Sequence, residues 1–541
     1  MSELFSKRKI YDEGNPSSNL WILGEAGGEE EDRKQQPFVG RAGDLLNESL
    51  SIIGVQRHEC FITNVFPHRP KDNNFSLILD TIELKDNLVR LSDLHKQHKP
   101  NVIMCLGENV INQLIQFYGI GVFRGSILEY QGSKAIPTYH PAAILREDSL
   151  YPIFMRDVRF IARESRYPEF NYPVYNYIID PQDDSFVELL ASKEYISCDI
   201  ENTKKDKRIL CVGFGFDDTG ITYPWIPKNI PKIEYILKSK AKKIFHSGSH
   251  DVNTLTWQGF PINNYCEDTI SQAHILQPEL PRDLNYLSSI YTRLPSYKKL
   301  GRQTIPDDEK SWGANRTPEE LHIYNAKDCV VTYKVWEAQN KELKERNLES
   351  FYRSEMDMAI ASIELSQTGL LRDQDRVEFL IKGINKTRLE KYTFLFQLTK
   401  LKFKVRSNKD VPYVLYEHLK LPKRKQRKTK KNQEPGLTTD EDAIVSLIGF
   451  CKNKIAEYST ESKIMEWKIK LGVLKLILEL RGIEKLLSSY LKCPSSNDGV
   501  VRSVFKVFST DTGRLSASKF VDGTGMNLQT PPRDLMEIEH E

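Results

Sequence analysis

Short apolar clusters alternate with amphipathic stretches over roughly the first 165 residues. Residues 20–28 (LWILGEAGG), 59–65 (ECFITNV), 101–108 (NVIMCLGE) and 136–143 (IPTYHPAA) each read as an apolar run that leads into a turn or loop. This pattern is typical of buried strands, and the amphipathic stretch at 77–94 predicts a helix between two of them. We therefore expect an α/β domain with a parallel sheet, which binds its ligands at the carboxyl ends of the strands.

The pattern changes twice further along the chain. Residues 166–184 are rich in Pro and aromatic residues, which indicates a linker, and a second α/β pattern begins at the sequence YISCDIEN. Later sequence is mainly helical and is interrupted by the basic stretch KRKQRKTKKNQEPG. The predicted fold class is therefore α/β multidomain. Its predicted parts are an α/β domain at 1–165, a linker at 166–185, a second α/β domain at 186–345 and a mainly helical region at 346–541.

Composition sets the class of protein. The chain has 541 residues, enough for three or four domains, and a net charge of only +3. No apolar run approaches the ~20 residues that span a bilayer, and the amino terminus has no secretory apolar segment. We therefore expect no membrane partner and a cytoplasmic location. The eight cysteines form no CxxC pair, so neither a disulfide framework nor a zinc ribbon is indicated.

Four acidic residues and a tyrosine carry the strongest chemical pattern. Asp199 and Glu201 alternate with apolar residues, so both carboxylates share one face of a strand. Asp251 follows a strand-like segment, and Tyr324 and Asp328 lie four residues apart on a predicted helix. A DxE pair or a YxxxD spacing alone is common, but the ordered set is much less probable by chance. Such neighbouring acids repel unless a cation lies between them, and oxygen ligands from three elements can hold two divalent ions.

This acidic set resembles that of the DnaQ-like 3′–5′ exonucleases, specifically the proofreading domain of family A DNA polymerases, which has a ribonuclease H-like fold. The resemblance implies that Asp199, Glu201, Asp251 and Asp328 bind two divalent ions, Mg²⁺ or Mn²⁺, and that Tyr324 orients the attacking water. Two such ions stabilise the attacking and the leaving oxygens of a phosphodiester. One departure is Ser247, where the family usually has Asn.

Three motifs in the first domain, GEAGGEEEDRKQQPFVGRAGDLL, FITNVFPHRP and TYHPAAILR, together resemble the family 4 uracil-DNA glycosylases. Such an enzyme needs a pocket for a base that has been extruded from the stack. The resemblance implies that Phe38 stacks on the base, Asn64 reads its edge and His140 donates to the departing uracil. It also implies that Glu25 positions or activates water.

The first domain departs from that family at its iron–sulfur cluster. No cysteine precedes Glu25, His68 stands where a cysteine is usual, and no cysteine lies near Asn87. Because such clusters need thiolate ligands, we expect no iron–sulfur cluster. Gly27 also replaces the proline usual in this turn. The residues therefore leave open whether the domain is an active glycosylase or only grips DNA.

The last third resembles the start of a family A polymerase domain, with its thumb and the beginning of its palm. The segments RGIEKLLSSYLK and TGRLS, followed by NLQ, carry this resemblance. It implies DNA contacts from Thr512, Arg514, Asn527 and Gln529, with the Ser516 hydroxyl near them. A basic run between thumb-like segments predicts an arm that neutralises phosphates. This run consists of Lys423, Arg424, Lys425, Arg427, Lys428, Lys430 and Lys431.

The whole architecture resembles the amino-terminal part of a bacteriophage family A polymerase, which would place the protein in the host cytoplasm. The sequence reaches Glu541 without the palm strand and fingers helix of that family, so we expect no polymerisation by this chain alone. Expected partners are primer–template duplex, a single-stranded 3′ end, and the remaining polymerase part or a replication subunit. The leading hypothesis is a 3′–5′ exonuclease. The alternatives are a non-catalytic DNA-binding scaffold and a uracil-DNA repair glycosylase.

Overall fold

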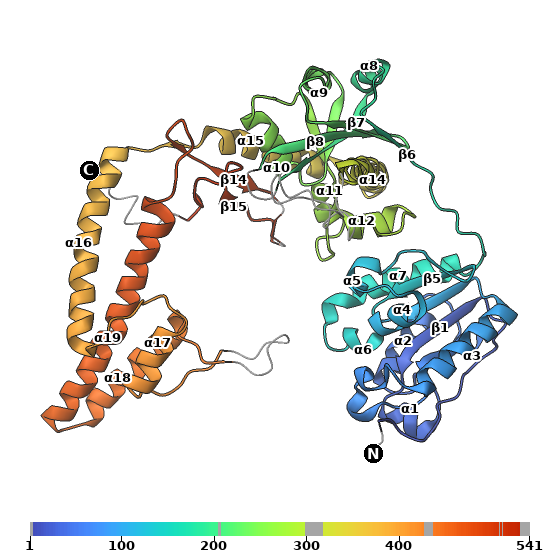
Figure 1. Ribbon diagram of the computed structural model, residues 1–541, viewed down its shortest axis with the longest axis horizontal. Coiled ribbons are helices and arrows are strands. Elements are labelled where there is room, and N and C mark those ends of the chain that lie inside the picture. The colour runs from blue at the N-terminus through green and yellow to red at the C-terminus, as the bar shows by residue number, and fades with distance from the viewer. Residues whose placement is uncertain are drawn as a thin grey trace. The chain divides into compact units, whose positions relative to one another are not determined.

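The structure is a computed structural model, and it describes residues 4–203, 207–297, 318–426, 436–507, 509–510 and 512–530. The chain divides into two compact units (Figure 1). One comprises Met1–Glu364 with Lys506–Ser516, and the other comprises Leu365–Phe505 with Ala517–Glu541. Among the described residues, no helix combines the length and apolar character needed to cross a bilayer.

The first domain is a three-layered α/β fold, as the alternation of apolar and amphipathic segments predicts. Its sheet has the order β2-β1-β3-β5-β4, and only the edge strand β4 is antiparallel to its neighbour. The strands are β1 (Leu20–Ala26), β2 (Phe61–Phe66), β3 (Val102–Leu106), β4 (Leu128–Tyr130) and β5 (Ser133–Thr138). The helices are α1 (Glu29–Lys34), α2 (Arg41–Ile52), α3 (Ile82–His98), α4 (Glu108–Ile115), α5 (Ile120–Phe123), α6 (Pro141–Ile144) and α7 (Tyr151–Glu164).

Two apolar clusters cover the two faces of this sheet. Helices α2 and α7 contribute Leu46 and Phe154 to one cluster, whereas α3 and α4 contribute Leu84 and Val110 to the other. Helix α3 begins at a side-chain cap, because the Thr81 hydroxyl accepts a hydrogen bond from the backbone N–H of Leu84. Among the predicted base-binding residues, Glu25 and Asn64 lie near the carboxyl ends of β1 and β2. Phe38 lies between α1 and α2, and His140 follows β5 as the N-cap of α6.

The second domain contains a mixed sheet with the order β11-β10-β7-β8-β9-β6. The strands are β6 (Asn176–Ile179), β7 (Tyr195–Asn202), β8 (Ile209–Phe216), β9 (Thr219–Pro224), β10 (Lys242–Phe245) and β11 (Tyr265–Asp268). The helices are α8 (Ser185–Ser192), α9 (Ile230–Lys238), α10 (Ser249–Trp257), α11 (Thr269–Leu276), α12 (Leu284–Tyr291), α14 (Pro318–Glu345) and α15 (Glu349–Thr368). Strand β6 pairs with β9 within 166–185, so the stretch that sequence indicated as a linker already contains part of this sheet.

The two α/β domains contact each other inside the first compact unit. Ile153 of α7 packs with Tyr286 and Leu287 of α12 in one apolar cluster. Both guanidinium NH groups of Arg293 donate to the Glu164 carboxylate, at 2.5 and 2.8 Å. Glu164 is fully buried and also accepts from the equally buried Lys134. A charge network therefore crosses the junction alongside the apolar contact.

The remaining unit is mainly helical, in agreement with the sequence prediction. Its elements are β12 (Leu370–Leu371), α16 (Gln374–Thr399), α17 (Asp410–Pro412), a π-helical segment (Tyr413–His418), α18 (Glu441–Glu457), α19 (Glu461–Leu486), a second π-helical segment (Leu487–Leu491) and β13 (Val500–Val501). Most of β14 (Ser503–Lys506) and of β15 (Ser516–Lys519) also belongs to this unit, and only Lys506 and Ser516 of these strands fall in the first one. Leu395, Leu447 and Leu474 bring α16, α18 and α19 into one core. The α/β multidomain fold class, with a helical region after the two α/β domains, is thus confirmed.

Candidate functional site

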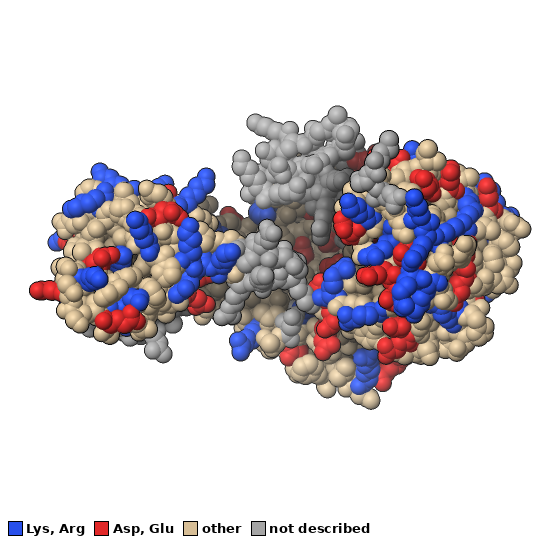
Figure 2. Space-filling view, turned by 90° about the horizontal axis from the view of Figure 1, so that it is seen from below, with Lys and Arg blue, Asp and Glu red and all other residues tan. Residues whose placement is uncertain are grey.

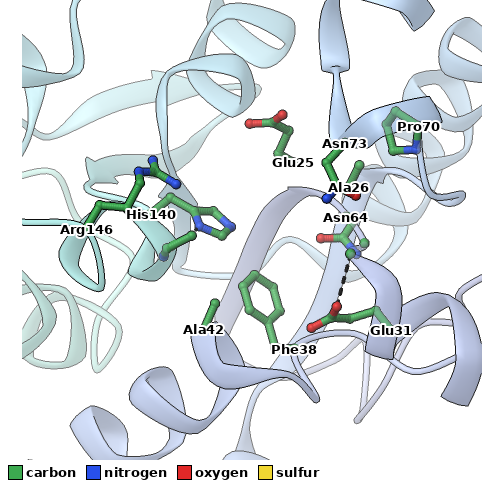
Figure 3. A pocket seen from close by; sticks show the side chains of 13 residues that line it. Glu25, Ala26, Glu31, Phe38, Ala42, Asn64, Pro70, Asn73, His140 and Arg146 are labelled. Carbon is green, nitrogen blue, oxygen red and sulfur yellow. Dashed lines mark hydrogen bonds between the residues drawn. The ribbon is translucent and has the colours of Figure 1, made fainter. Parts of the chain in front are cut away.

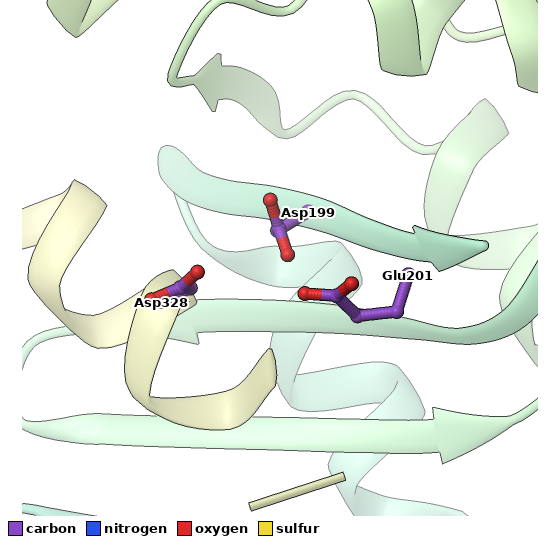
Figure 4. A group of neighbouring side chains, drawn as sticks. All are labelled: Asp199, Glu201 and Asp328. Carbon is purple, nitrogen blue, oxygen red and sulfur yellow. The ribbon is translucent and has the colours of Figure 1, made fainter. Parts of the chain in front are cut away.

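The acidic group lies where strand β7 meets helix α14. Asp199, Glu201 and Asp328 each contribute one carboxylate oxygen, and these three oxygens lie within 4.8 Å of one another (Figure 4). Asp199 and Glu201 point from β7 toward Asp328 on α14, as the alternation in YISCDIEN predicted. The donors are all carboxylate oxygens, which is the ligand chemistry that Mg²⁺ and Mn²⁺ prefer. The group therefore fits a hard divalent cation.

A stripe of glycines lets helix α14 approach the sheet this closely. A Cβ atom on Gly213 of β8 would lie 2.3 Å from Asn325 Oδ1 and 2.6 Å from Cys329 Sγ. A Cβ atom on Gly220 of β9 would lie 2.3 Å from the carbonyl oxygen of Ala326. Gly213 is the direct neighbour of Asp199 on the adjacent strand. Because Gly213 has no side chain, α14 can pack close enough to the sheet for Asp328 to reach Asp199.

Asn325 fixes the orientation of Asp199. Its Nδ2 donates to Asp199 Oδ2 at 2.8 Å, and its Oδ1 accepts from the Thr222 hydroxyl at 2.9 Å. Asn325 is not among the residues predicted from the sequence. Its position three residues before Asp328, on the same helical face, is the signal that could have revealed it.

Two tyrosines lie against Asp328. The Tyr297 hydroxyl donates to Asp328 Oδ1 at 2.6 Å, and the Tyr297 and Tyr324 rings meet edge to face. Burial raises the pKa of the Tyr324 phenol well above its usual range, and the nearby Asp328 carboxylate raises it further. Tyr324 thus lies beside the acidic group, as predicted. Tyr297 was missed, because no spacing links it to Asp328.

Asp251 lies next to this group but outside the set of three. It is buried in the first turn of α10, 7% exposed, and burial together with the charges of Asp199 and Asp268 raises its pKa well above the usual range. Asp268, which the sequence analysis missed, holds the turn before α10. Its carboxylate accepts from the backbone N–H groups of Ser247 and Gly248 at 3.0 and 2.8 Å. The signal for Asp268 was its place as the N-cap residue of α11.

The predicted base-binding residues line one pocket of about 440 Å³ in the first domain (Figure 3). Glu25, Phe38, Asn64 and His140 all face it, together with Glu31 and Arg146, which sequence did not single out. The Phe38 and His140 rings are stacked, with centroids 5.8 Å apart. A Cβ atom on Gly24 would lie 2.3 Å from Asn64 Oδ1 and 2.5 Å from the Phe38 ring, so glycine keeps this wall open.

The His140 ring is neutral at physiological pH. Burial and the nearby Arg146 lower the pKa of His140 to about 4. Its Nδ1 accepts from the backbone N–H of Ala142 at 3.1 Å, so the neutral ring carries its proton on Nε2. The ring can therefore donate one hydrogen bond through Nε2. Burial also raises the pKa of the Glu25 carboxyl.

Two residues outside the predicted set hold the pocket loops. The Glu31 carboxylate accepts from the backbone N–H of Gly28 at 3.0 Å (dashed in Figure 3) and of Gly40 at 3.0 Å. Arg57 donates to the carbonyl oxygens of Pro37 and Phe38 at 2.7 and 3.3 Å and pairs with Glu13 at 2.6 Å. Phe38 has a φ of +51°, and these bonds stabilise that unfavourable backbone conformation.

His68 and Asn87 stand where the resemblance implies ligands of an iron–sulfur cluster, and both make other contacts. His68 Nδ1 lies 2.8 Å from the carbonyl oxygen of Arg8, and the His68 ring packs against Phe5 and Phe66. Asn87 Nδ2 donates to the backbone carbonyls of Asn64 and Val65, at 3.1 and 2.9 Å. Asn87 thus supports the end of strand β2, which carries Asn64.

The predicted DNA-contacting residues are partly described. Arg424 and Thr438 share a backbone hydrogen bond of 2.9 Å, and Lys425 forms a bridge with Leu437, so the described base of the basic arm is a paired hairpin. Lys423 pairs with Glu417 at 2.8 Å. Arg427, Lys428, Lys430 and Lys431 lie outside the described residues. Thr512, Arg514, Asn527 and Gln529 are described and exposed.

Two family models match separate parts of the chain. A model of the uracil DNA glycosylase superfamily matches residues 11–160, and a model described as 3′–5′ exonuclease matches residues 179–344. The type-4 uracil-DNA glycosylase of Archaeoglobus fulgidus is 36% identical over 157 residues, which cover 27% of this chain and 77% of that protein. The Pyrobaculum aerophilum enzyme is 36% identical over 165 residues, covering 28% and 82%.

The later part of the chain is similar to DNA polymerase I. The Bacillus subtilis protein is 26% identical over 343 residues, which cover 60% of this chain and 34% of that protein. This chain thus spans about a third of the length of that relative. Among solved structures, the polymerase domain of Pol1 from M. smegmatis, in complex with primer–template DNA and dNTP, matches with a TM-score of 0.44 and 17% identity, covering 66% of this chain and 56% of that one. The chain therefore belongs to the uracil-DNA glycosylase superfamily through its first domain, which is fused to a DNA polymerase I-like 3′–5′ exonuclease domain.

Proposed function

We propose that the second domain hydrolyses DNA from the 3′ end by a two-metal mechanism. The observation that carries this proposal is the set of carboxylate oxygens from Asp199, Glu201 and Asp328 within 4.8 Å of one another. These residues would hold Mg²⁺ or Mn²⁺, with the neighbouring Asp251 as a further ligand. When bound, the ions would activate water and stabilise charge on the phosphodiester. Tyr324 orients the attacking water, since its hydroxyl lies beside Asp328.

A 5′-labelled single strand tests this proposal. Wild-type protein with Mg²⁺ should shorten it stepwise, whereas Asp199→Ala with Glu201→Ala should lose activity by ~10³-fold or more, because the ligands act as one unit. Tyr324→Phe should slow hydrolysis and leave Mn²⁺ binding unchanged. The matched control is Glu234→Gln, at an exposed acid of the same domain paired with Lys238. A double variant that degrades DNA at the wild-type rate would refute the site.

A second proposal concerns the first domain, which we propose recognises uracil extruded from DNA. The pocket of about 440 Å³ combines a stacking ring in Phe38, an amide in Asn64 and a neutral donor in His140. An amide at the base edge and a neutral Nε2–H suit a base with carbonyl acceptors, and neither needs a counterion. The support is strongest for recognition, since Asn64, Phe38 and Gly24 form one wall.

Matched oligonucleotides that contain uracil or thymine at one position test recognition and excision separately. The wild type should prefer the uracil strand, and Asn64→Ala should remove that preference because the base edge is then unread. Release of free uracil by the wild type would assign glycosylase activity. A preference without release would make the domain a uracil-binding module, and the absence of any preference would overturn the proposal.

We further propose that the exonuclease proofreads within a DNA polymerase I-like polypeptide, with primer–template DNA and the remaining polymerase part as partners. Support comes from the similarity to DNA polymerase I over 343 residues and from the exposed Arg514, Asn527 and Gln529. Arg514→Gln should weaken primer–template binding equally for all sequences, because backbone contacts carry no sequence information. Unchanged affinity would remove Arg514 from the DNA-contacting set.

A further inference from the structure

A second cavity lies at the junction of the two α/β domains. It has a volume of about 320 Å³, and its walls come from α7, from Arg124 at the end of α5, and from Ser289 and Ile290 of α12. Four arginines line this arginine cavity: Arg124, Arg156, Arg159 and Arg163. The volume is on the order of ten water molecules' share of the liquid, so a phosphate group fits with room to spare.

One arginine is part of the cavity's framework. Arg124 is 4% exposed and forms a two-pronged ion pair with Asp157, with Nε 2.8 Å from Oδ2. Its NH1 donates to the Ser289 hydroxyl at 2.9 Å, and its guanidinium lies over the Tyr286 ring. Asp157 is the one acid among the residues that line the cavity, and this pair already neutralises it.

The other three arginines leave the cavity positively charged. Arg156 NH1 donates to the neutral amide of Gln277 at 3.0 Å, and Arg163 lies over the Phe160 ring. Within the described part of the chain, Arg156, Arg159 and Arg163 have no carboxylate partner. Elsewhere, acidic and basic side chains both occur over the face seen in Figure 2, and many of the exposed cations are paired.

The spacing concentrates this charge on one face of α7. Residues at i, i+3 and i+7 project from the same side of a helix, and like charges at such spacing destabilise it by ~0.2–0.5 kcal/mol per pair. An anion between the side chains reverses the sign of that contribution. Arginine is the side chain best suited to phosphate, because its planar guanidinium presents two parallel N–H donors.

We infer that the arginine cavity binds a phosphate group, supplied by the backbone of a DNA strand. A free 5′-mononucleotide offers the same chemistry and is the alternative source. This site is separate from the acidic group on β7 and α14 and from the pocket around Phe38. The inference rests on the arginines themselves and does not require the exonuclease to be active.

Binding of a fluorescein-labelled single strand to the full-length protein in EDTA tests this inference. Without divalent ions the strand is not hydrolysed, and the acidic group is the same in all the variants compared. Arg159→Gln with Arg163→Gln should weaken binding several-fold at low salt. It should also flatten the plot of log K against log salt by ~0.7 per lost phosphate contact, about 1.4 in total. Arg159→Lys with Arg163→Lys should keep the wild-type slope, because the charge remains.

The matched control removes two exposed cations from the opposite face of the same sheet, as Lys85→Gln with Lys96→Gln on α3. These changes should leave the slope unchanged. If the control variant lost as much of the salt slope as the arginine variant, the binding would be general surface attraction and the inference would be overturned. The inference would also be overturned if Arg159→Gln with Arg163→Gln kept the wild-type slope and a free nucleotide gave no arginine-dependent protection.

Thermal protection by dTMP distinguishes the two sources of phosphate. If dTMP protects the protein only when Arg159 and Arg163 are present, and the strand binds equally well without these arginines, the cavity is a site for free nucleotide. Arginine-dependent binding of the strand assigns it to DNA, and either result upholds a phosphate site. Loss of exonuclease activity in the Asp199 variant concerns only the acidic group, so the two proposals fail independently.

Discussion

The acidic group on β7 and α14 differs from the pocket around Phe38, Asn64 and His140, the proposed base pocket, in the charge of its polar side chains. Asp199, Glu201 and Asp328 place three carboxylates within 4.8 Å of one another, an arrangement whose repulsion a bound cation would relieve. His140 and Asn64 instead face their pocket as neutral groups, and burial keeps the His140 ring uncharged. A site that binds metal can be recognised by unbalanced charge. A site that binds a neutral base is recognised by shape and by the direction of its hydrogen bonds.

The two sites also differ in what holds them. The acidic group is fixed by close packing of a helix on glycines of two strands, so its geometry belongs to the core of the domain. The base pocket is fixed by side chains that bind loop backbone, chiefly Glu31 and Arg57. We therefore expect changes beneath the acidic group to alter stability and activity together, and changes around the pocket to act more locally.

The largest effect should come from the metal ligands. Adding Mn²⁺ to ~100 times its Kd should stabilise the wild type by ~2.7 kcal/mol, since only the folded site binds. Asp199→Asn should abolish this gain, and without metal it should be at least as stable as the wild type, because one repelling charge is gone. Calorimetric scans with Mn²⁺ and with EDTA measure both effects.

Asn64→Ala is the matched control for the metal effect, because it changes the other site and should keep the full gain from Mn²⁺. If Asp199→Asn still gained stability from Mn²⁺, the ion would bind elsewhere, and the contrast between a charged and a neutral site would lose its basis.

The next largest effect should follow from filling the glycine stripe. Gly213→Ala places a methyl group 2.3 Å from Asn325 Oδ1, and overpacking of this kind costs ~1–3 kcal/mol. Displacement of α14 should also separate Asp328 from Asp199 and lower the exonuclease rate. Urea denaturation and the rate of strand shortening measure the two consequences.

Gly383 of α16 provides a control for the alanine substitution, because nothing lies within 4 Å of its Cβ position. Gly383→Ala should stabilise its helix by up to ~1 kcal/mol, since alanine is the better helix former. A neutral Gly213→Ala would show that the helix can move without cost, and that packing does not define the acidic group.

The sequence predicted much of this arrangement, for physical reasons. Period-two alternation located β7 and its two carboxylates, and apolar runs located the buried parallel strands of the first domain. The contacts that support the two sites were not predicted. Arg57 reaches Phe38 from 19 residues away, and Gly213 matters only because α14 packs on it. Such contacts depend on tertiary structure, which local periodicity does not encode.

A smaller effect should appear in the pH dependence of the base pocket. As the pH falls below 6.5, His140 in the unfolded chain takes up a proton, whereas the folded ring stays neutral until about pH 4. The unfolded state then binds more protons, so stability should fall across this window, by ~1–3 kcal/mol. Above pH 6.5 this contribution should be constant.

His140→Asn isolates that contribution, because Asn also caps the helix that begins at Pro141 and cannot titrate. Unfolding free energies at pH 4.5 and pH 7.5 should differ less for the variant than for the wild type. An equal difference in both proteins would mean that the folded protein also carries a charged His140 at pH 4.5. Burial would then not keep this ring neutral, and the contrast with the acidic group would fail.

The smallest effect concerns the turn between β10 and α10, beside the acidic group. Ser247 is exposed and has a φ of +62°, a left-handed conformation that Asn tolerates better than Ser. Its backbone N–H is held by Asp268, so a substitution changes the cost of the conformation and keeps the hydrogen bond. Ser247→Asn should therefore stabilise the protein by ~0.5 kcal/mol in denaturant titration. Ser247→Ala keeps the unfavourable φ and should give no gain. If the two variants changed the free energy of unfolding equally, the left-handed conformation at Ser247 would carry no backbone cost. The loop beside the acidic group would then be held by packing alone.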